Sequence, residues 1–215
     1  MFDINENLEI KKEYLEGSVI YTADNFYKDP DKLVELLSII DPIIWKEQQQ
    51  PSNNMVEFED KRHIINSKHV VKVYQFLRNI CGIEDVGNEE NQHLVITNVT
   101  RFKKSKFNDY KNNYWWPHKD LSRYAAIIYL NKNDYVSGTN IYKNLNPSEE
   151  PPNCPEHYMP WRSKTNYSII KQLKPKYNRM VLFDGSKFFH GMNITNDDYF
   201  EKECRMNQVL FLGTY

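Results

Sequence analysis

Two stretches in the first ninety residues carry apolar side chains at the three- and four-residue spacing of one helix face. Pro30 suits a first helical turn and Pro42 stops the pattern, so the first stretch predicts a helix over residues 30–41. The second stretch predicts a helix from a Ser67 cap to Gly82, a good residue for the left-handed turn after a helix. We expect both helices to pack against a sheet. Their apolar positions are Leu33, Leu36, Leu37, Ile40, Val70, Val71, Tyr74, Leu77 and Ile80.

The pattern changes to short strands from about residue 93. Segments rich in Val, Ile, Tyr, Phe and Leu are separated by turn-prone pieces such as NKND and DGSK. These segments are 93–102, 124–131, 139–143, 179–183 and 205–213. Short strands that follow helices favour an antiparallel double sheet. The predicted fold class is mainly β with flanking helices: a double-stranded β-helix core of the jelly-roll or cupin kind, packed by N-terminal helices.

The 215 residues suit a single domain. We expect residues 1–92 to form a helical support region and residues 93–215 to form the β core. An insertion over 143–176 interrupts that core and holds six of the ten prolines, as lids, binding loops or disordered segments often do. Residues of the insertion that could line a substrate mouth, or simply pack on the surface, are Tyr158, Trp161 and Arg162.

Composition narrows the function classes. The net charge is −1, so no overall field draws the protein to nucleic acid or to an anionic membrane. Three widely spaced cysteines without a CxxC pair argue against a disulfide framework and against a thiolate zinc site. No apolar run approaches the ~20 residues that span a bilayer. We expect a soluble, cytoplasmic protein, and the Lys- and Asn-rich chain suits a bacterium or a phage.

The candidate chemistry begins at the HxD motif. His118 and Asp120 are two residues apart, so in an extended chain both side chains point to the same face. A second imidazole is available at His190, after the strand predicted at 179–183. Two imidazoles and one carboxylate form the facial triad that binds non-haem iron and leaves coordination positions open. The alternatives are a chance HxD and a core histidine.

Arg205 is the second candidate, at the head of the last predicted strand. Both faces of that strand are largely apolar, which predicts a central place in a sandwich. A guanidinium is costly to bury there without a partner. A dicarboxylic cosubstrate would supply a bidentate partner. The alternative is an ordinary ion pair with Glu201 or with Asp120 itself.

Taken in order, these motifs resemble the Fe(II)/2-oxoglutarate-dependent dioxygenase superfamily, and within it the prolyl-hydroxylase-like branch. The resemblance covers about residues 93–215. It rests on PHKD with YLNKNDYVSGTNIY, on PKYNRMVLFDGSKFFHGM and on ECRMNQVLFL.

The resemblance implies roles for individual residues. Arg205 matches the basic residue that grips the distal carboxylate of 2-oxoglutarate, and Tyr129 matches a tyrosine that hydrogen-bonds the same carboxylate. Thr139 is expected to help shape the cosubstrate pocket. The residues that match the iron ligands are His118, Asp120 and His190.

The chain also departs from the family pattern. Arg205 lies fifteen positions after His190, a longer interval than is usual, which makes Lys202 a fallback anchor. Phe102 stands where many relatives have a tyrosine. The segment before His118 is long, and we expect its aromatic residues to wall the site. These residues are Tyr114, Trp115 and Trp116.

The resemblance implies an iron(II)- and 2-oxoglutarate-dependent oxygenase. It would use oxygen to hydroxylate a peptidyl, amino-acid or small-molecule substrate and would release succinate and carbon dioxide. Two other classes stay open, a cupin-like metalloenzyme without 2-oxoglutarate and a non-catalytic double-sheet binding module. The substrate and the oligomeric state do not follow from the sequence.

Overall fold

The protein is mainly β, with antiparallel sheets and few helices. The structure is a computed structural model, and it describes residues 2–39, 43–44, 58–66, 68–83, 94–102, 107–132, 138–147, 161–194 and 205–214. The helices in these parts are α1 (Pro30–Ile39), α2 (Lys68–Cys81) and α3 (Phe107–Asn112).

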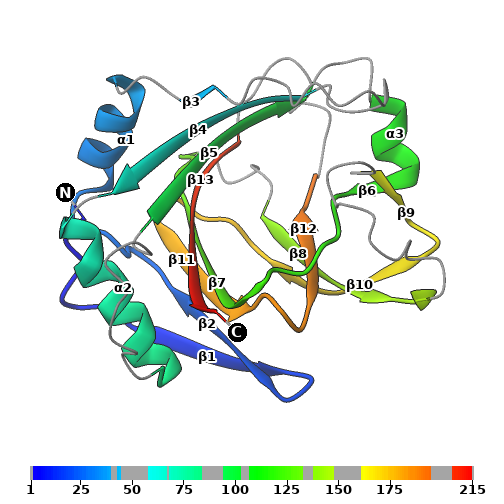
Figure 1. Cartoon of the computed structure of the whole chain (residues 1–215), viewed down its shortest axis with the longest axis horizontal. Helices are drawn as coiled ribbons and strands as arrows, with labels where there is room; N and C mark the ends of the chain where they lie inside the picture. Colours follow the sequence, from blue (N-terminus) through cyan, green and yellow to red (C-terminus); the bar gives the residue numbers. More distant parts are fainter. Residues whose placement is uncertain are drawn as a thin grey trace.

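The strands form two main sheets and a short ribbon (Figure 1). The large sheet has the order β1 (Ile10–Leu15), β2 (Ser18–Ala23), β11 (Arg179–Asp184), β7 (Ser122–Tyr129), β13 (Arg205–Thr214), β5 (Leu94–Phe102), β4 (Phe58–Asn66) and β3 (Ile43–Ile44). The small sheet has the order β10 (Tyr167–Leu173), β8 (Thr139–Asn144) and β12 (Phe189–Met192). The ribbon pairs β6 (Asn113–Trp115) with β9 (Trp161–Ser163).

The large sheet is covered on both faces, which its strand β7 shows most clearly. Ala126 and Ile128 pack into a core that includes side chains of α1 and α2. Ala125 and Ile127 point the other way, into a core shared with Ile141 of the small sheet. Because side chains alternate along a strand, one apolar segment serves both cores. Figure 1 shows α1 and α2 on one side of the large sheet and the small sheet on the other.

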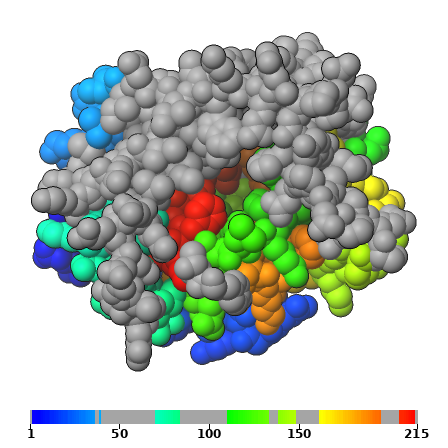
Figure 2. Space-filling view, in the orientation of Figure 1, coloured from blue at the N-terminus to red at the C-terminus, as the bar shows by residue number. Residues whose placement is uncertain are grey.

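Strand β13 lies between β7 and β5, so the prediction of a central strand is confirmed. Leu210 and Leu212 belong to the core on the helix side. On that side Gln208 accepts a hydrogen bond from the Tyr27 hydroxyl at 3.0 Å. Phe211 faces the other way and is 37% exposed. In Figure 2, side chains of β13 (red) reach the surface beside green and orange atoms of the middle and last third of the chain.

Helices α1 and α2 occupy the segments where the apolar spacing predicts them. Gly82 follows α2 with φ of 65°, as expected of a residue in the left-handed turn. The Ser67 cap lies outside the described residues. Helix α2 buries Val73 in place of the predicted Val71, which is half-buried.

The sequence predicts a helical support region over residues 1–92, and the structure shows strands there in addition to α1 and α2. Strands β1 to β4 lie there: β1 and β2 form one edge of the large sheet, and β4 and β3 form the opposite edge. The hairpin of β1 and β2 turns at Glu16 and Gly17, both with positive φ, as a tight hairpin turn requires. Strand β1 escapes a pattern search because it is an edge strand whose charged residues are largely exposed.

The predicted insertion over 143–176 also needs correction, because β10 is a regular strand of the small sheet and pairs with β8. Five of the six prolines precede this strand, and the segment YSIIKQL has ordinary strand character. Of the three mouth candidates, Tyr158 lies outside the described residues and Trp161 and Arg162 lie in β9. In the described part of the chain, no helix has the length and apolar character needed to cross a bilayer.

Candidate metal centre

His118, Asp120 and His190 meet at one point. Each offers a ligand atom, and these atoms all lie within 4.8 Å of one another. Nε2 of His118 is 3.6 Å from Oδ1 of Asp120, and Nε2 of His190 is 3.2 Å from Oδ2. The fold therefore brings the predicted triad together, although His118 and His190 are 72 positions apart in the chain.

Backbone hydrogen bonds hold the two chain segments in place. His118 and His190 form an antiparallel bridge, with N–H···O distances of 3.0 and 2.8 Å. The N–H of Asp120 donates to the carbonyl of Gly185 at 2.9 Å. His190 lies in β12, and the segment from His118 to Asp120 leads into β7. One candidate ligand is thus fixed by a strand, and main-chain hydrogen bonds tie the 118–120 segment to His190 and Gly185, which favours a preorganised site.

Each imidazole is oriented by a main-chain carbonyl. Nδ1 of His118 lies 2.7 Å from the Trp116 carbonyl, and Nδ1 of His190 lies 3.0 Å from the Phe188 carbonyl. A carbonyl can only accept, so in both neutral rings the proton sits on Nδ1. The lone pair is then on Nε2, the atom nearest Asp120. Histidines that bind metals are commonly oriented in this way.

Asp120 is an anion in a nearly buried position, with 9% of its side chain exposed. Burial alone would raise the pKa of this carboxyl, but interactions with the two imidazoles outweigh burial and hold the pKa below its ordinary value, because a protonated ring carries charge and can donate from Nε2. Oδ2 is buried, and no described residue gives it a properly aligned hydrogen bond. Two imidazole nitrogens and a carboxylate with an unsatisfied buried oxygen are a donor set that fits a divalent metal such as iron(II).

Two glycines make room for this arrangement, and the sequence prediction did not single them out. A Cβ at Gly185 would lie 2.5 Å from Oδ2 of Asp120. A Cβ at Gly191 would lie 2.5 Å from the Trp115 carbonyl oxygen, beside the His118 segment. Both distances are shorter than any side chain tolerates. The DG turn and the HG pair were visible in the sequence, but their role depends on contacts between distant segments.

Aromatic rings wall part of the site. The Trp116 ring lies 5.6 Å from that of His118, and the Phe183 ring packs edge-on at 4.9 Å from His190. Trp116 has φ of 49°, a sparsely populated conformation for a tryptophan. Trp115 instead packs against Trp161 and Met192. Of the aromatic residues predicted to wall the site, Trp116 is thus the one whose ring is shown to contact a triad histidine.

The three predicted cosubstrate residues also meet, at the far end of β7. The Tyr129 hydroxyl donates to Oγ1 of Thr139 at 3.0 Å, and the Arg205 guanidinium lies 5.9 Å from the centre of the Tyr129 ring. All three are buried. Burial raises the pKa of Tyr129 although Arg205 and Thr139 oppose the shift, so the phenol remains a donor at neutral pH.

Asn207 is a neighbour of this group that the prediction missed. Its side-chain oxygen accepts a hydrogen bond from Arg205, and it is 1% exposed. The signal was its position two residues after Arg205 on the same strand face. The fallback anchor Lys202 and the alternative partner Glu201 lie outside the described residues, as does the side chain of Phe102.

Comparison with known proteins adds no relative. No protein-family model matches the chain, and no curated protein matches it either. The site is therefore interpreted from its own geometry: His118, Asp120 and His190 at one place, and Tyr129, Thr139 and Arg205 at another.

Proposed function

We propose that this protein is an iron(II)- and 2-oxoglutarate-dependent oxygenase of the prolyl-hydroxylase-like kind. The observation that carries the proposal is the convergence of His118, Asp120 and His190, with all ligand atoms within 4.8 Å. Two imidazoles and one carboxylate with open positions are the usual iron site of such oxygenases. The buried group of Arg205, Tyr129 and Thr139 supports the use of a dicarboxylic cosubstrate.

The triad would hold iron(II) through Nε2 of both histidines and through the Asp120 carboxylate. Bound iron would supply the activation of oxygen: one oxygen atom enters succinate as 2-oxoglutarate loses carbon dioxide, and the other becomes the hydroxyl of the product. The chain's own residues orient the reactants and keep water away. His118 has the most exposed side chain of the three, at 25%, so reactants would approach from its side.

Arg205 would bind the distal carboxylate of 2-oxoglutarate through paired hydrogen bonds, and the Tyr129 hydroxyl would donate a further one. Such charge-assisted bonds are strong in a site that excludes water. Asn207 holds the guanidinium from the same strand. Oγ1 of Thr139 accepts a hydrogen bond from the Tyr129 hydroxyl and so fixes the direction of that hydroxyl.

The proposed fold is a double-stranded β-helix. Support comes from the two facing antiparallel sheets and from the position of the site. The ligand His190 lies on the small sheet, whereas Tyr129 and Arg205 lie on the large sheet. A cosubstrate held between the sheets would connect the two groups.

An anaerobic titration tests the proposal. Iron(II) and then 2-oxoglutarate are added to metal-free protein and visible absorption is followed, with Arg205→Ala in parallel. We expect a weak charge-transfer band that needs both additions, and a 2-oxoglutarate requirement at least roughly tenfold higher in the variant, because a charged hydrogen-bond partner is lost. Iron binding without the band would favour a cupin-like metalloenzyme. Failure to bind iron would favour a non-catalytic binding module.

A further inference from the structure

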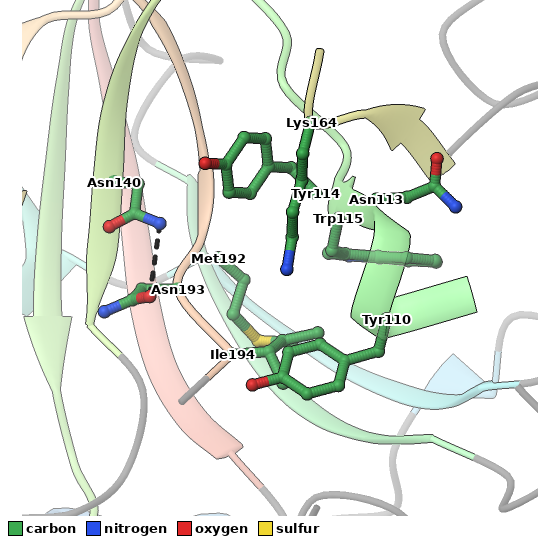
Figure 3. A pocket seen from close by; sticks show the side chains of 9 residues that line it. All are labelled: Tyr110, Asn113, Tyr114, Trp115, Asn140, Lys164, Met192, Asn193 and Ile194. Carbon is green, nitrogen blue, oxygen red and sulfur yellow. Dashed lines mark hydrogen bonds between the residues drawn. The ribbon is translucent and has the colours of Figure 1, made fainter. Parts of the chain in front are cut away.

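A pocket lies on the chain segments that precede and follow the triad residues, and none of the three triad residues lines it. Strand β6, three residues before His118, pairs with β9. These strands, helix α3, strand β8 and the end of β12 bring together side chains that line one pocket (Figure 3). The lining residues that matter here are Tyr110, Tyr114, Trp115, Asn140, Lys164 and Asn193.

The pocket has a polar wall and an aromatic wall. Asn140 is 1% exposed, and its amide nitrogen donates to the side-chain oxygen of Asn193 at 3.1 Å and to the Tyr142 hydroxyl at 3.2 Å. Figure 3 shows this amide pair on one side of the pocket, with Trp115 and Tyr110 on the other. Because hydrogen bonds already fix the Asn140 amide, a ligand that binds it loses less free energy to ordering than one that binds a mobile side chain.

Lys164 gives the pocket its charge. Its ammonium lies 5.3 Å from the centre of the Tyr110 ring and 5.5 Å from that of Tyr114, and it donates to the Lys111 carbonyl at 3.0 Å. An ammonium has three N–H donors, so two are left for a ligand. Figure 3 shows the side chain reaching between the two walls. Among the described residues that line the pocket, none is acidic, so the pocket favours an anion.

The pocket is physically tied to the metal centre. Strand β12 carries both His190 and the pocket residue Met192, and Trp115 precedes His118 by three residues. At roughly 3.3 Å per residue for a fully extended chain, these pocket residues lie at most roughly 10 Å along the chain from the triad. The tight approach of Gly191 to the Trp115 carbonyl keeps the two segments in register.

We propose that this pocket binds the carboxylate of the oxygenase's substrate, with Lys164 as the anion-binding residue. The inference rests on the proposed function and narrows the substrate to a carboxylate-bearing one, either a free amino acid or the C-terminal residue of a peptide. The aromatic wall packs against the remainder of that group. Lys164 is then a specificity residue, distinct from the cosubstrate anchor Arg205.

Methyl NMR of metal-free, full-length protein labelled with ¹³C-methyl methionine tests the proposal, because Met192 lines the pocket. A Met192→Leu sample assigns its resonance among the six methionines. The probes are N-acetylglycine and glycine, each compared with its neutral amide. We expect the acids to shift the Met192 resonance saturably. The amides, and the acids on Lys164→Met, should bind at least roughly tenfold more weakly.

Lys174→Met is the matched control, because Lys174 is exposed and lies outside the pocket. It should bind the acids as the parent does. Equal shifts with acid and amide, no shift up to roughly 100 mM acid, or unchanged binding by Lys164→Met would each overturn the proposal. Stronger binding of N-acetylglycine would indicate a peptide C-terminus, and stronger binding of glycine a free amino acid.

The iron and 2-oxoglutarate titration separates this inference from the proposed function. Lys164→Met should give the charge-transfer band at the parent's 2-oxoglutarate concentration, because Arg205 is intact. A higher requirement would make Lys164 a cosubstrate anchor and overturn its assignment to substrate. Carboxylate binding at Met192 without any band would keep the pocket as an anion site and reject the oxygenase.

Discussion

The two faces of the large sheet differ sharply, although the same strands build both. On the helix side, β7 and β13 present residues such as Ile128 and Leu210, and the buried Gln208 is paired with Tyr27. On the side of the small sheet, the same strands present Tyr129 and Arg205. The first face is closed and largely apolar, whereas the second also carries the buried polar residues Tyr129 and Arg205, which the proposed cosubstrate would contact. Because side chains alternate along a strand, β7 and β13 direct core residues to one face and the candidate site residues to the other.

The largest effect expected on the polar side comes from His118→Ala. Mutation of a group that hydrogen-bonds to a metal ligand typically lowers metal affinity about 10- to 100-fold. Removal of a ligand itself should therefore lower iron affinity further and abolish turnover. Equilibrium dialysis with iron(II) measures the affinity, and circular dichroism checks that the fold is kept. Parent-like iron affinity in a folded variant would remove His118 from the site.

On the apolar side, Leu77→Ala should lower the free energy of unfolding by about 2–5 kcal/mol. Leu77 is fully buried between α2 and the large sheet, so truncation leaves a cavity. Urea unfolding of the metal-free protein measures the change. Iron affinity of the folded variant should stay at the parent value, and a clear drop would show that the two faces are coupled.

Gly185→Ala should lower iron affinity less than His118→Ala does, because it displaces a candidate ligand without removing one. The added methyl would come within 2.5 Å of Oδ2 of Asp120, and we expect iron affinity to fall roughly 10- to 100-fold, as for other changes that misorient a ligand. Gly82→Ala is the matched control. It places alanine at φ of 65° with no atom within 4 Å, so it should lower stability by roughly 1 kcal/mol and leave iron binding unchanged. Similar iron affinities in the two variants would argue against a steric role for Gly185.

The smallest effect concerns an ion pair between Asp24, which follows β2, and Arg179, which begins β11. Hydrogen bonds from Arg179, opposed by burial and aided by Lys176, lower the pKa of Asp24 to about 2 from an ordinary 3.8. A depressed folded pKa stabilises the protein above the unfolded pKa, and this stability is lost as the pH falls from about 4 to about 2. Asp24→Asn should therefore cost roughly 1 kcal/mol near pH 6, after allowance for solvent screening. Urea unfolding at several pH values should show the difference shrinking with acid.

Much of the candidate site can be predicted from the sequence, because it depends on short residue spacings and on the order of motifs along the chain. The two-residue spacing of His118 and Asp120 predicts that both side chains point the same way, as their convergence shows, and His190 follows a recognisable strand. The alternation along β13 likewise predicts that Arg205 faces away from the Leu210 core. Such signals depend on strand periodicity, which a sequence displays directly.

Other features depend on contacts between distant segments and were missed. Strand β1 is polar and exposed, so its place in the sheet follows from pairing with β2 and not from its own pattern. Gly185 matters because Asp120 packs against it, and Asn207 matters because Arg205 bonds to it. The pairing of β6 with β9 joins segments that the sequence places 45 residues or more apart.

The most direct test of the central claim is to locate the metal. Crystals grown anaerobically with iron(II) would be measured at wavelengths on either side of the iron absorption edge. We predict one strong anomalous peak between Nε2 of His118, Nε2 of His190 and the Asp120 carboxylate, absent in His118→Ala. A peak at another place, or none at these three residues in the parent protein, would contradict the assignment of the metal centre.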